Sequence, residues 1–178
     1  MWKTAGMEIR PAPLLNGSFR VRRATRLDVG PIVALLQSDE LGAPGPPGSH
    51  DGGLEPYLEA FGAIDADPAH FLAAVEDAGG RIAGTLQLTL VPCLAAGAVP
   101  RLQVEAVHVR ADLRSLGLGA AMMEWAVAQG RSNGAGLVQL TSNHRRKAAH
   151  RFYRRLGFEA SHIGFKRRLP VLPDSVRD

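Results

Sequence analysis

The stretch that decides the fold runs from Arg101 to Ala120 and reads RLQVEAVHVRADLRSLGLGA. Its first ten residues predict a β-strand, because apolar and polar side chains alternate along them. The apolar residues change parity midway: first Leu102, Val104 and Ala106, then Val107 and Val109. A strand keeps one buried face unless a residue is inserted or both faces are buried. The pattern therefore predicts either a β-bulge near Ala106, a feature common beside active sites, or a strand buried on both faces.

Glycines follow this strand, and an amphipathic helix is expected from Gly117 to Gly130. The helix has apolar residues at helical spacing: Leu118, Ala121, Met122, Trp125 and Ala126. Glycines let the backbone approach a ligand closely, and the first N–H groups of a helix have no internal acceptor. With the helix dipole and Arg114 they form an anion site. The site is not the dinucleotide fingerprint, because Met122 stands where the third glycine belongs.

The other expected elements make a mixed sheet with helices on its faces. Further strands are expected at 19–24, 70–76, 81–91 and 137–141, with a closing pair at 158–161 and 165–169. Further helices are expected after Thr25, which Asp28 caps, and at 54–65 and 146–156. Residues 1–16 are expected to be irregular because of Pro11 and Pro13, and 41–53 is expected to be a Pro/Gly loop.

The combination of strand, R-x-x-G-x-G, amphipathic helix, strand, and a helix ending in Leu156-Gly157-Phe158 resembles the GNAT superfamily of acetyl-CoA-dependent N-acetyltransferases. The resemblance extends from about Phe19 to Leu169. It implies an α/β (α+β) single-domain fold with a mixed, mostly antiparallel sheet of six to seven strands and helices on both faces. It also implies a V-shaped splay between the strands at 101–110 and 137–141. Residues 1–18 would form an N-terminal arm, 19–169 the N-acetyltransferase domain, and 170–178 a C-terminal tail.

The resemblance further implies acetyl-CoA as co-substrate, no metal, and a role for each matching residue. Glu105 matches the general base of many members, and Tyr153 matches the tyrosine that protonates the departing thiolate. The pantetheine arm would contact Val107, His108 and Val109. The pyrophosphate would contact Arg114, Leu116, Gly117, Leu118, Gly119 and Ala120. Arg146 stands where many members carry Asn, and either Arg146 or Asn143 is a candidate for contact with the coenzyme.

The chemistry of amine acetylation supports a carboxylate base. A lysine-like amine has a pKa near 10.4, so about one molecule in 10³ is neutral and nucleophilic at pH 7. A carboxylate held in the cleft can accept the proton. Glu105 is the only acid between Asp77 and Asp112. The alternatives are that Glu105 is a solvated strand residue and that Tyr153 is a core aromatic.

Composition places the chain among ordinary soluble proteins. It has 178 residues, a net charge of +4 and 46% hydrophobic residues, which fits one domain and excludes wholesale disorder. No apolar run is long enough to span a bilayer, and no signal-peptide stretch is evident. The single cysteine, Cys93, excludes an internal disulfide. These observations lead us to expect a cytoplasmic protein with no membrane partner.

Charge suggests what binds to the protein. Ten acids and no Lys or Arg lie between Leu27 and Gly80. This stretch is either a solvated acidic surface or a wall that attracts a cationic acceptor such as a polyamine, an aminosugar or a peptide amine. The basic helix at 145–155 raises a rival, a nucleic-acid-binding module, although nucleic acid is the less expected partner. A third reading is an acyl-CoA sensor without turnover, and a homodimer is possible.

Overall fold

The computed structural model describes residues 6–38, 53–167 and 169. These residues form a six-stranded sheet in the order β1-β2-β3-β4-β5-β6, with every neighbouring pair antiparallel except the parallel pair β5–β6. The strands are β1 Ala12–Leu14, β2 Phe19–Arg23, β3 His70–Asp77, β4 Ile82–Val91, β5 Arg101–Val109 and β6 Leu137–Leu140. The fold class predicted from the sequence, with about six strands in a mixed sheet, is confirmed.

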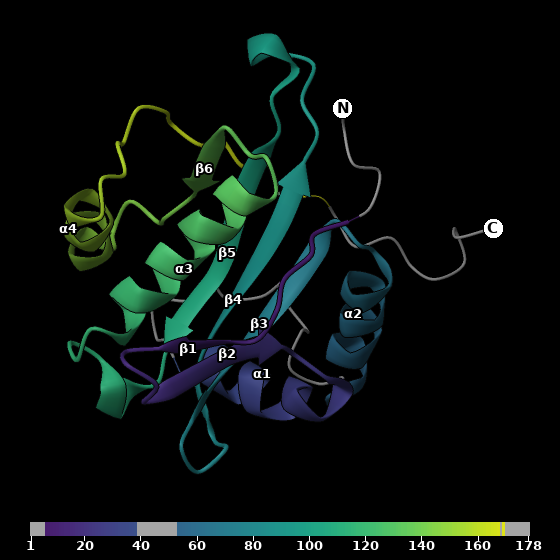
Figure 1. Ribbon diagram of the computed structural model, residues 1–178, viewed down its shortest axis with the longest axis vertical. Helices are drawn as coiled ribbons and strands as arrows, with labels where there is room; N and C mark the ends of the chain where they lie inside the picture. The colour runs from purple at the N-terminus through teal and green to yellow at the C-terminus, as the bar shows by residue number, and fades with distance from the viewer. Residues whose placement is uncertain (1–5, 39–52, 168, 170–178) are drawn as a thin grey trace.

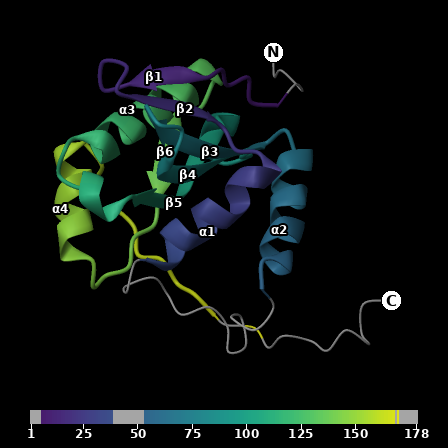
Figure 2. The ribbon, with the colours of Figure 1, turned by 90° about the horizontal axis from the view of Figure 1, so that it is seen from below.

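Helices cover both faces of this sheet. They are α1 Val29–Gln37, α2 Glu55–Ala66, α3 Leu118–Ser132 and α4 Lys147–Arg155, with short 3₁₀ turns at 26–28, 96–98 and 111–113. Helices α3 and α4 lie on one face, and α1 and α2 lie on the other (Figures 1 and 2). The Pro/Gly loop predicted at 41–53 lies, apart from Gly53, outside the described residues.

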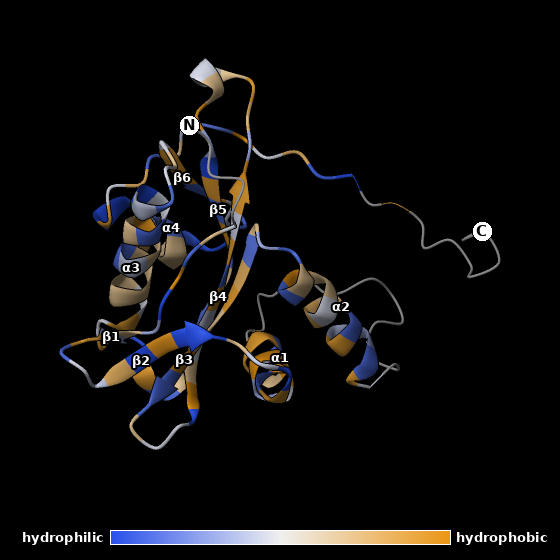
Figure 3. Ribbon diagram, turned by 45° about the vertical axis from the view of Figure 1, so that its right-hand side comes forward, coloured by the Kyte–Doolittle hydropathy of each residue, from blue (hydrophilic) through white to orange (hydrophobic). Residues whose placement is uncertain are grey.

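The main core lies between the sheet and α3. Phe71, Leu86, Leu88, Leu102 and Met122 are fully buried there. A smaller cluster beneath α1 and α2 includes Ile32, Phe61 and Ala74. Most of α1 is hydrophobic, as Figure 3 shows. Burial of these side chains on both faces supplies the main driving force for the fold.

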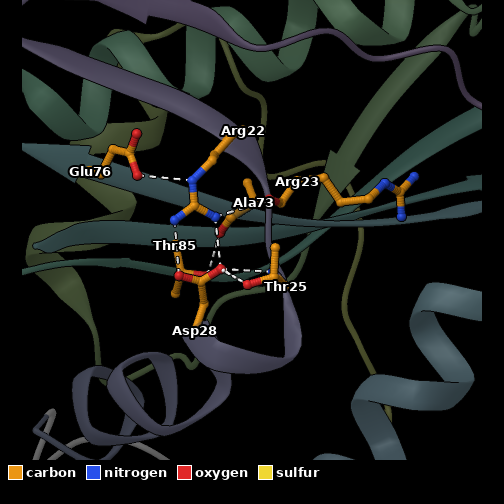
Figure 4. A network of polar contacts seen from close by, with 7 residues as sticks. All are labelled: Arg22, Arg23, Thr25, Asp28, Ala73, Glu76 and Thr85. Atoms are coloured by element: carbon orange, nitrogen blue, oxygen red, sulfur yellow. Dashed lines mark hydrogen bonds and ion pairs between the residues drawn. The ribbon is translucent and has the colours of Figure 1, made fainter. Parts of the chain in front are cut away.

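A polar network anchors the start of α1 to the sheet (Figure 4). The Arg22 guanidinium on β2 donates to both carboxylate oxygens of Asp28, at 2.7 and 3.0 Å, and to Glu76 on β3 at 2.9 Å. Asp28 also accepts hydrogen bonds from the backbone N–H and the hydroxyl of Thr25, so the predicted capping pair is confirmed. The hydrogen bonds from Arg22 hold the pKa of Asp28 at about 2, well below its ordinary value, although burial opposes this shift.

Two predictions of local structure are wrong. Residues 12–14, expected to be irregular, form β1 and pair with β2, with Pro13 opposite Arg20. Proline is tolerated there because β1 is an edge strand, where a missing N–H costs no ladder hydrogen bond. The closing strand pair at 158–161 and 165–169 is absent from the described residues, and Ile163 and Phe165 are exposed. Phe158 packs against the main core, whereas Phe165 and Leu169 bury no apolar surface of the kind that would hold a strand in place.

Candidate active site

A β-bulge interrupts β5 at the predicted place. Glu105 lies opposite Gln87 and His108 lies opposite Thr85, so two residues of β5 face the single intervening residue of β4. Ala106 takes the left-handed conformation, with φ 52°. The extra residue explains the change in parity, because Leu102, Val104, Val107 and Val109 all contribute to the core on the α3 side. The bulge, rather than burial of both faces, is the correct interpretation of the sequence pattern.

Strands β5 and β6 stop pairing just before the bulge. Their pairing runs from Arg101 with Leu137 to Val104 with Leu140. From Glu105 onward, no strand among the described residues pairs with β5 on the β6 side. The edge of this half of β5 that faces away from β4 therefore has no strand partner among the described residues, and strand edges of this kind bind extended partners. The splay predicted between these two strands matches this end of pairing.

The glycine turn lies directly beyond the splayed half of β5. Gly117 is the residue before α3 and has a φ of 91°, a left-handed conformation that glycine adopts without steric cost. The N–H groups of Leu118, Gly119 and Ala120 have no backbone acceptor within the described part of the chain. Arg114 is exposed, and its Nε donates to the carbonyl oxygen of Val109 at 3.2 Å. The turn thus presents free donors, the positive end of a 15-residue helix and a cation.

Glu105 is exposed on β5, immediately before the bulge. Its parity is that of Gln103, so its side chain is on the sheet face that carries α1 and α2. After the bulge, the His108 side chain is on the same face of the sheet as Glu105, but its ring nitrogens are buried. Burial favours a packed residue at His108, whereas exposure leaves Glu105 accessible to a substrate.

Tyr153 lies on α4 and packs among aromatic rings. Its ring makes edge contacts with Phe152, at 5.1 Å between centroids, and with Phe158, at 6.0 Å. Burial raises the pKa of Tyr153 above its ordinary value, and the nearby positive charge of Arg146 opposes this rise. The phenol is protonated at neutral pH at its ordinary pKa, and the rise leaves this protonation state unchanged. The packing of Tyr153 is that of a core aromatic, and its role as a proton donor stays a prediction.

The residues before α4 form a hydrogen-bonded turn. The side-chain oxygen of Asn143 accepts from the N–H of Arg145 at 2.9 Å, and its backbone oxygen accepts from His150 Nε2 at 2.9 Å. Arg146 is the N-cap of α4 and is half-buried. Asn143 therefore has a structural task in the turn. The coenzyme contacts expected of Asn143 and Arg146 stay predictions.

The acidic stretch at 27–80 is partly neutralised by arginines. Four of its acids form ion pairs: Asp28 and Glu76 with Arg22, Asp65 with Arg23, and Asp77 with Arg81 and Arg110. Three others, Asp39, Glu40 and Asp51, lie outside the described residues. The stretch therefore carries less unpaired negative charge than its composition suggests.

Several polar residues near Glu105 were not among the site residues predicted from the sequence. The strand register places Gln87 directly opposite Glu105, and it aligns Thr89 with Gln103 and Gln103 with Gln139. The residues are scattered over 53 positions of the sequence, from Gln87 to Gln139. Only the register of β4, β5 and β6 brings them together. Their alternation with apolar residues along each strand was the one feature of the sequence that could have indicated them.

Comparisons with known proteins identify the class to which this architecture belongs. The model of the acetyltransferase (GNAT) family matches residues 35–158. A splayed sheet with a glycine turn before its long central helix is the arrangement that the sequence motifs predicted for that class. The chain belongs to the GNAT acetyltransferase family, and the family assignment made from its motifs is confirmed.

Individual relatives agree with this assignment. The chain is 34% identical over 67 residues to an aminoalkylphosphonate N-acetyltransferase of Salmonella typhimurium, a match that covers 38% of this chain and 44% of that protein. The crystal structure of a transcriptional regulator from Bacillus halodurans C-125 is 33% identical, with a TM-score of 0.75, and covers 84% of this chain and 98% of its own. A predicted acetyltransferase from Clostridium acetobutylicum, solved with acetyl-CoA, shares the fold at 12% identity, with a TM-score of 0.66 over 84% of this chain and 96% of its own.

No helix among the described residues is long and apolar enough to cross a membrane. The same residues contain no group of three or more His, Cys, Asp or Glu side chains that could hold a metal ion.

Proposed function

We propose that the protein is an N-acetyltransferase that moves an acetyl group from acetyl-CoA to a primary amine by direct attack. The observation that carries this proposal is the β5 bulge. It leaves an exposed carboxylate, Glu105, beside a strand edge that pairs with no other strand of the described residues, and the same strand leads into the glycine turn. Membership of the GNAT family supports the reaction class.

The residues present fit acetyl-CoA. The N–H groups at the start of α3 and the Arg114 side chain would bind the pyrophosphate, and the backbone of Val107, His108 and Val109 would hold the pantetheine arm. When bound, the coenzyme supplies a thioester whose carbonyl carbon is open to attack. Glu105 would take the proton from the attacking amine, and Tyr153 would protonate the sulfur that leaves.

The test is acetyl-CoA-dependent release of free thiol across a panel of amines. Glu105→Gln removes the base and keeps the size of the side chain, so we expect kcat/KM to fall by about 10²- to 10⁴-fold. Glu124→Gln is the matched control, because Glu124 is exposed on α3 and belongs to no proposed contact. Equal kcat/KM for Glu105→Gln and the unchanged protein would remove Glu105 as the base.

The nature of the acceptor is also a proposal. A cationic amine was expected from the acidic stretch, but the ion pairs of Asp28, Asp65, Glu76 and Asp77 reduce its support. The Salmonella relative is described as acting on an aminoalkylphosphonate, which carries an amine and an anion. The panel should therefore include polyamines, aminosugars, peptide amines and amines with an anionic group. Preference for polyamines at low salt would support the cationic acceptor.

A second candidate function, binding of nucleic acid, has two observations behind it. Helix α4 exposes Arg151, Arg154 and Arg155, and the Bacillus halodurans relative is described as a transcriptional regulator. A nucleic-acid-binding module would bind oligonucleotides with steep salt dependence and would not respond to the coenzyme. An acetyltransferase should gain about 2.7 kcal/mol of stability from acetyl-CoA at 100 times its Kd, a melting shift of several degrees. A sensor without turnover would show that shift but release no thiol.

A further inference from the structure

A polar row crosses four strands beside Glu105. The register aligns His70 of β3, Thr89 of β4, Gln103 of β5 and Gln139 of β6, each opposite the next. Because side chains alternate along a strand, this row is on one face of the sheet, and that face is the one that carries α1 and α2. The neighbouring residues on the other face are apolar and belong to the main core: Phe71, Leu88, Leu90, Leu102, Val104, Val138 and Leu140.

The members of the row are half-buried and contact one another in pairs. His70 Nδ1 and Thr89 Oγ1 are 2.9 Å apart, and Gln139 Nε2 donates to Gln103 Oε1 at 2.7 Å. These hydrogen bonds fix the side chains in place but use only part of their capacity, because each glutamine amide has two N–H donors and a carbonyl acceptor. The row is therefore an ordered set of donors and acceptors and not part of the apolar packing beneath α1 and α2.

Arg101 extends this face by one step. It lies two residues before Gln103 on β5, so its side chain is on the same face of the sheet. In the strand register it pairs with Val91 of β4 and Leu137 of β6. Its Nε is buried and has no hydrogen-bond partner among the residues that the structure describes. A buried donor on a charged group is costly to leave unpaired, and a guanidinium fork suits a carboxylate, phosphonate or phosphate. Among the paired residues of β4, β5 and β6, the only acid is Glu105.

We propose that Arg101, with the amides of Gln103 and Gln139 beside it, binds an anionic group on the acceptor amine. This inference rests on the proposed acetyl transfer and names the class of acceptor, a small amine that also carries a phosphonate, phosphate or carboxylate. Arg101 and Glu105 are four residues apart on β5, about 13 Å between their Cα atoms at the rise of a strand. Since the Arg101 side chain can lean along the strand, an amine at Glu105 and an anion a few bonds away fit between them.

The experiment compares two acceptors of similar length, 2-aminoethylphosphonate and propylamine, in the thiol-release assay. Arg101→Gln removes the fork, so kcat/KM for the phosphonate should fall by about 10- to 100-fold, as expected for hydrogen bonds to a charged group. With propylamine kcat/KM should change less than twofold, and the KM for acetyl-CoA should not change. Arg131→Gln, exposed near the end of α3, is the matched control and should leave both acceptors unaffected.

Equal losses for both acceptors, or no loss for the phosphonate, would overturn the role of Arg101. Arg101→Lys serves the same test if Arg101→Gln does not fold, because it keeps the charge and loses the bidentate geometry. If no amine is acetylated, the proposed function fails, and calorimetric binding of 2-aminoethylphosphonate to the protein with CoA still tests the anion site. Binding that both Arg101 variants weaken would support the site, and binding that neither changes would refute it.

Discussion

Replacement of Asp28 by asparagine tests how firmly α1 is held to the sheet. The pKa of Asp28 falls from 3.8 to about 2, chiefly because the Arg22 guanidinium donates to its carboxylate. At 1.36 kcal/mol for each pKa unit, this shift corresponds to about 2 kcal/mol of stability at neutral pH. Only 11% of the Asp28 side chain is exposed, so solvent screens this interaction little. Asp28→Asn should therefore lower the free energy of unfolding by about 2 kcal/mol at pH 7.

The dependence on pH gives the sharper test. A carboxyl with a depressed folded pKa stabilises the protein above its unfolded pKa, near 4, and this stability is lost as pH falls towards 2. Urea unfolding of the unchanged protein should therefore show a loss between pH 4 and 2 that Asp28→Asn lacks. Asp112→Asn is the control, because Asp112 pairs with Arg110 but is 62% exposed, and its effect should be smaller. Parallel losses in Asp28→Asn and the unchanged protein over this pH range would refute the reasoning.

Two further predictions concern the site. Tyr153→Phe should lower kcat less than Glu105→Gln does, because a thiolate with a pKa of about 8.5 is a fair leaving group. The pH–rate profiles of both variants measure this. A larger loss of kcat in Tyr153→Phe would show that the acid contributes more than the base. Gly117→Ala should cost about 1–2 kcal/mol, since alanine is strained at a φ of 91°, and should raise the KM for acetyl-CoA, which unfolding and steady-state kinetics measure. An unchanged KM would argue against the turn as the pyrophosphate site.

The bulge and the glycine turn could be predicted from the sequence because each has a local signature. A change of parity within one strand requires an inserted residue or two buried faces, and Gly117 precedes an amphipathic helix. Strand β1 escaped prediction, because Pro13 opposes a central strand and its edge position depends on the whole sheet. The closing strand pair was predicted as well, but Phe165 and Leu169 are exposed, and no strand forms among the described residues of 158–169.

The pairing of charged side chains was the property that could be predicted least well from the sequence. The run of acids between Leu27 and Gly80 looked unpaired because Arg22, Arg81 and Arg110 approach it from other strands or its edge. Their pairing depends on the register of β2 with β3 and of β4 with β5. Linear charge counts cannot contain this information, because contacts between strands join residues that are distant in the chain.

One inserted residue connects the proposed coenzyme and acceptor sites. Without the bulge, strict alternation would turn Val107 and Val109 to the side of Glu105, away from the α3 core to which they belong. With it, β5 keeps an apolar face towards α3 along its whole length and still presents Glu105 and Gln103 to the opposite face. Pairing with β6 also ends at Val104, two residues before Ala106. A variant that deletes Ala106 should therefore disturb core packing, coenzyme binding and base position together, whereas Glu105→Gln should affect the chemical step alone.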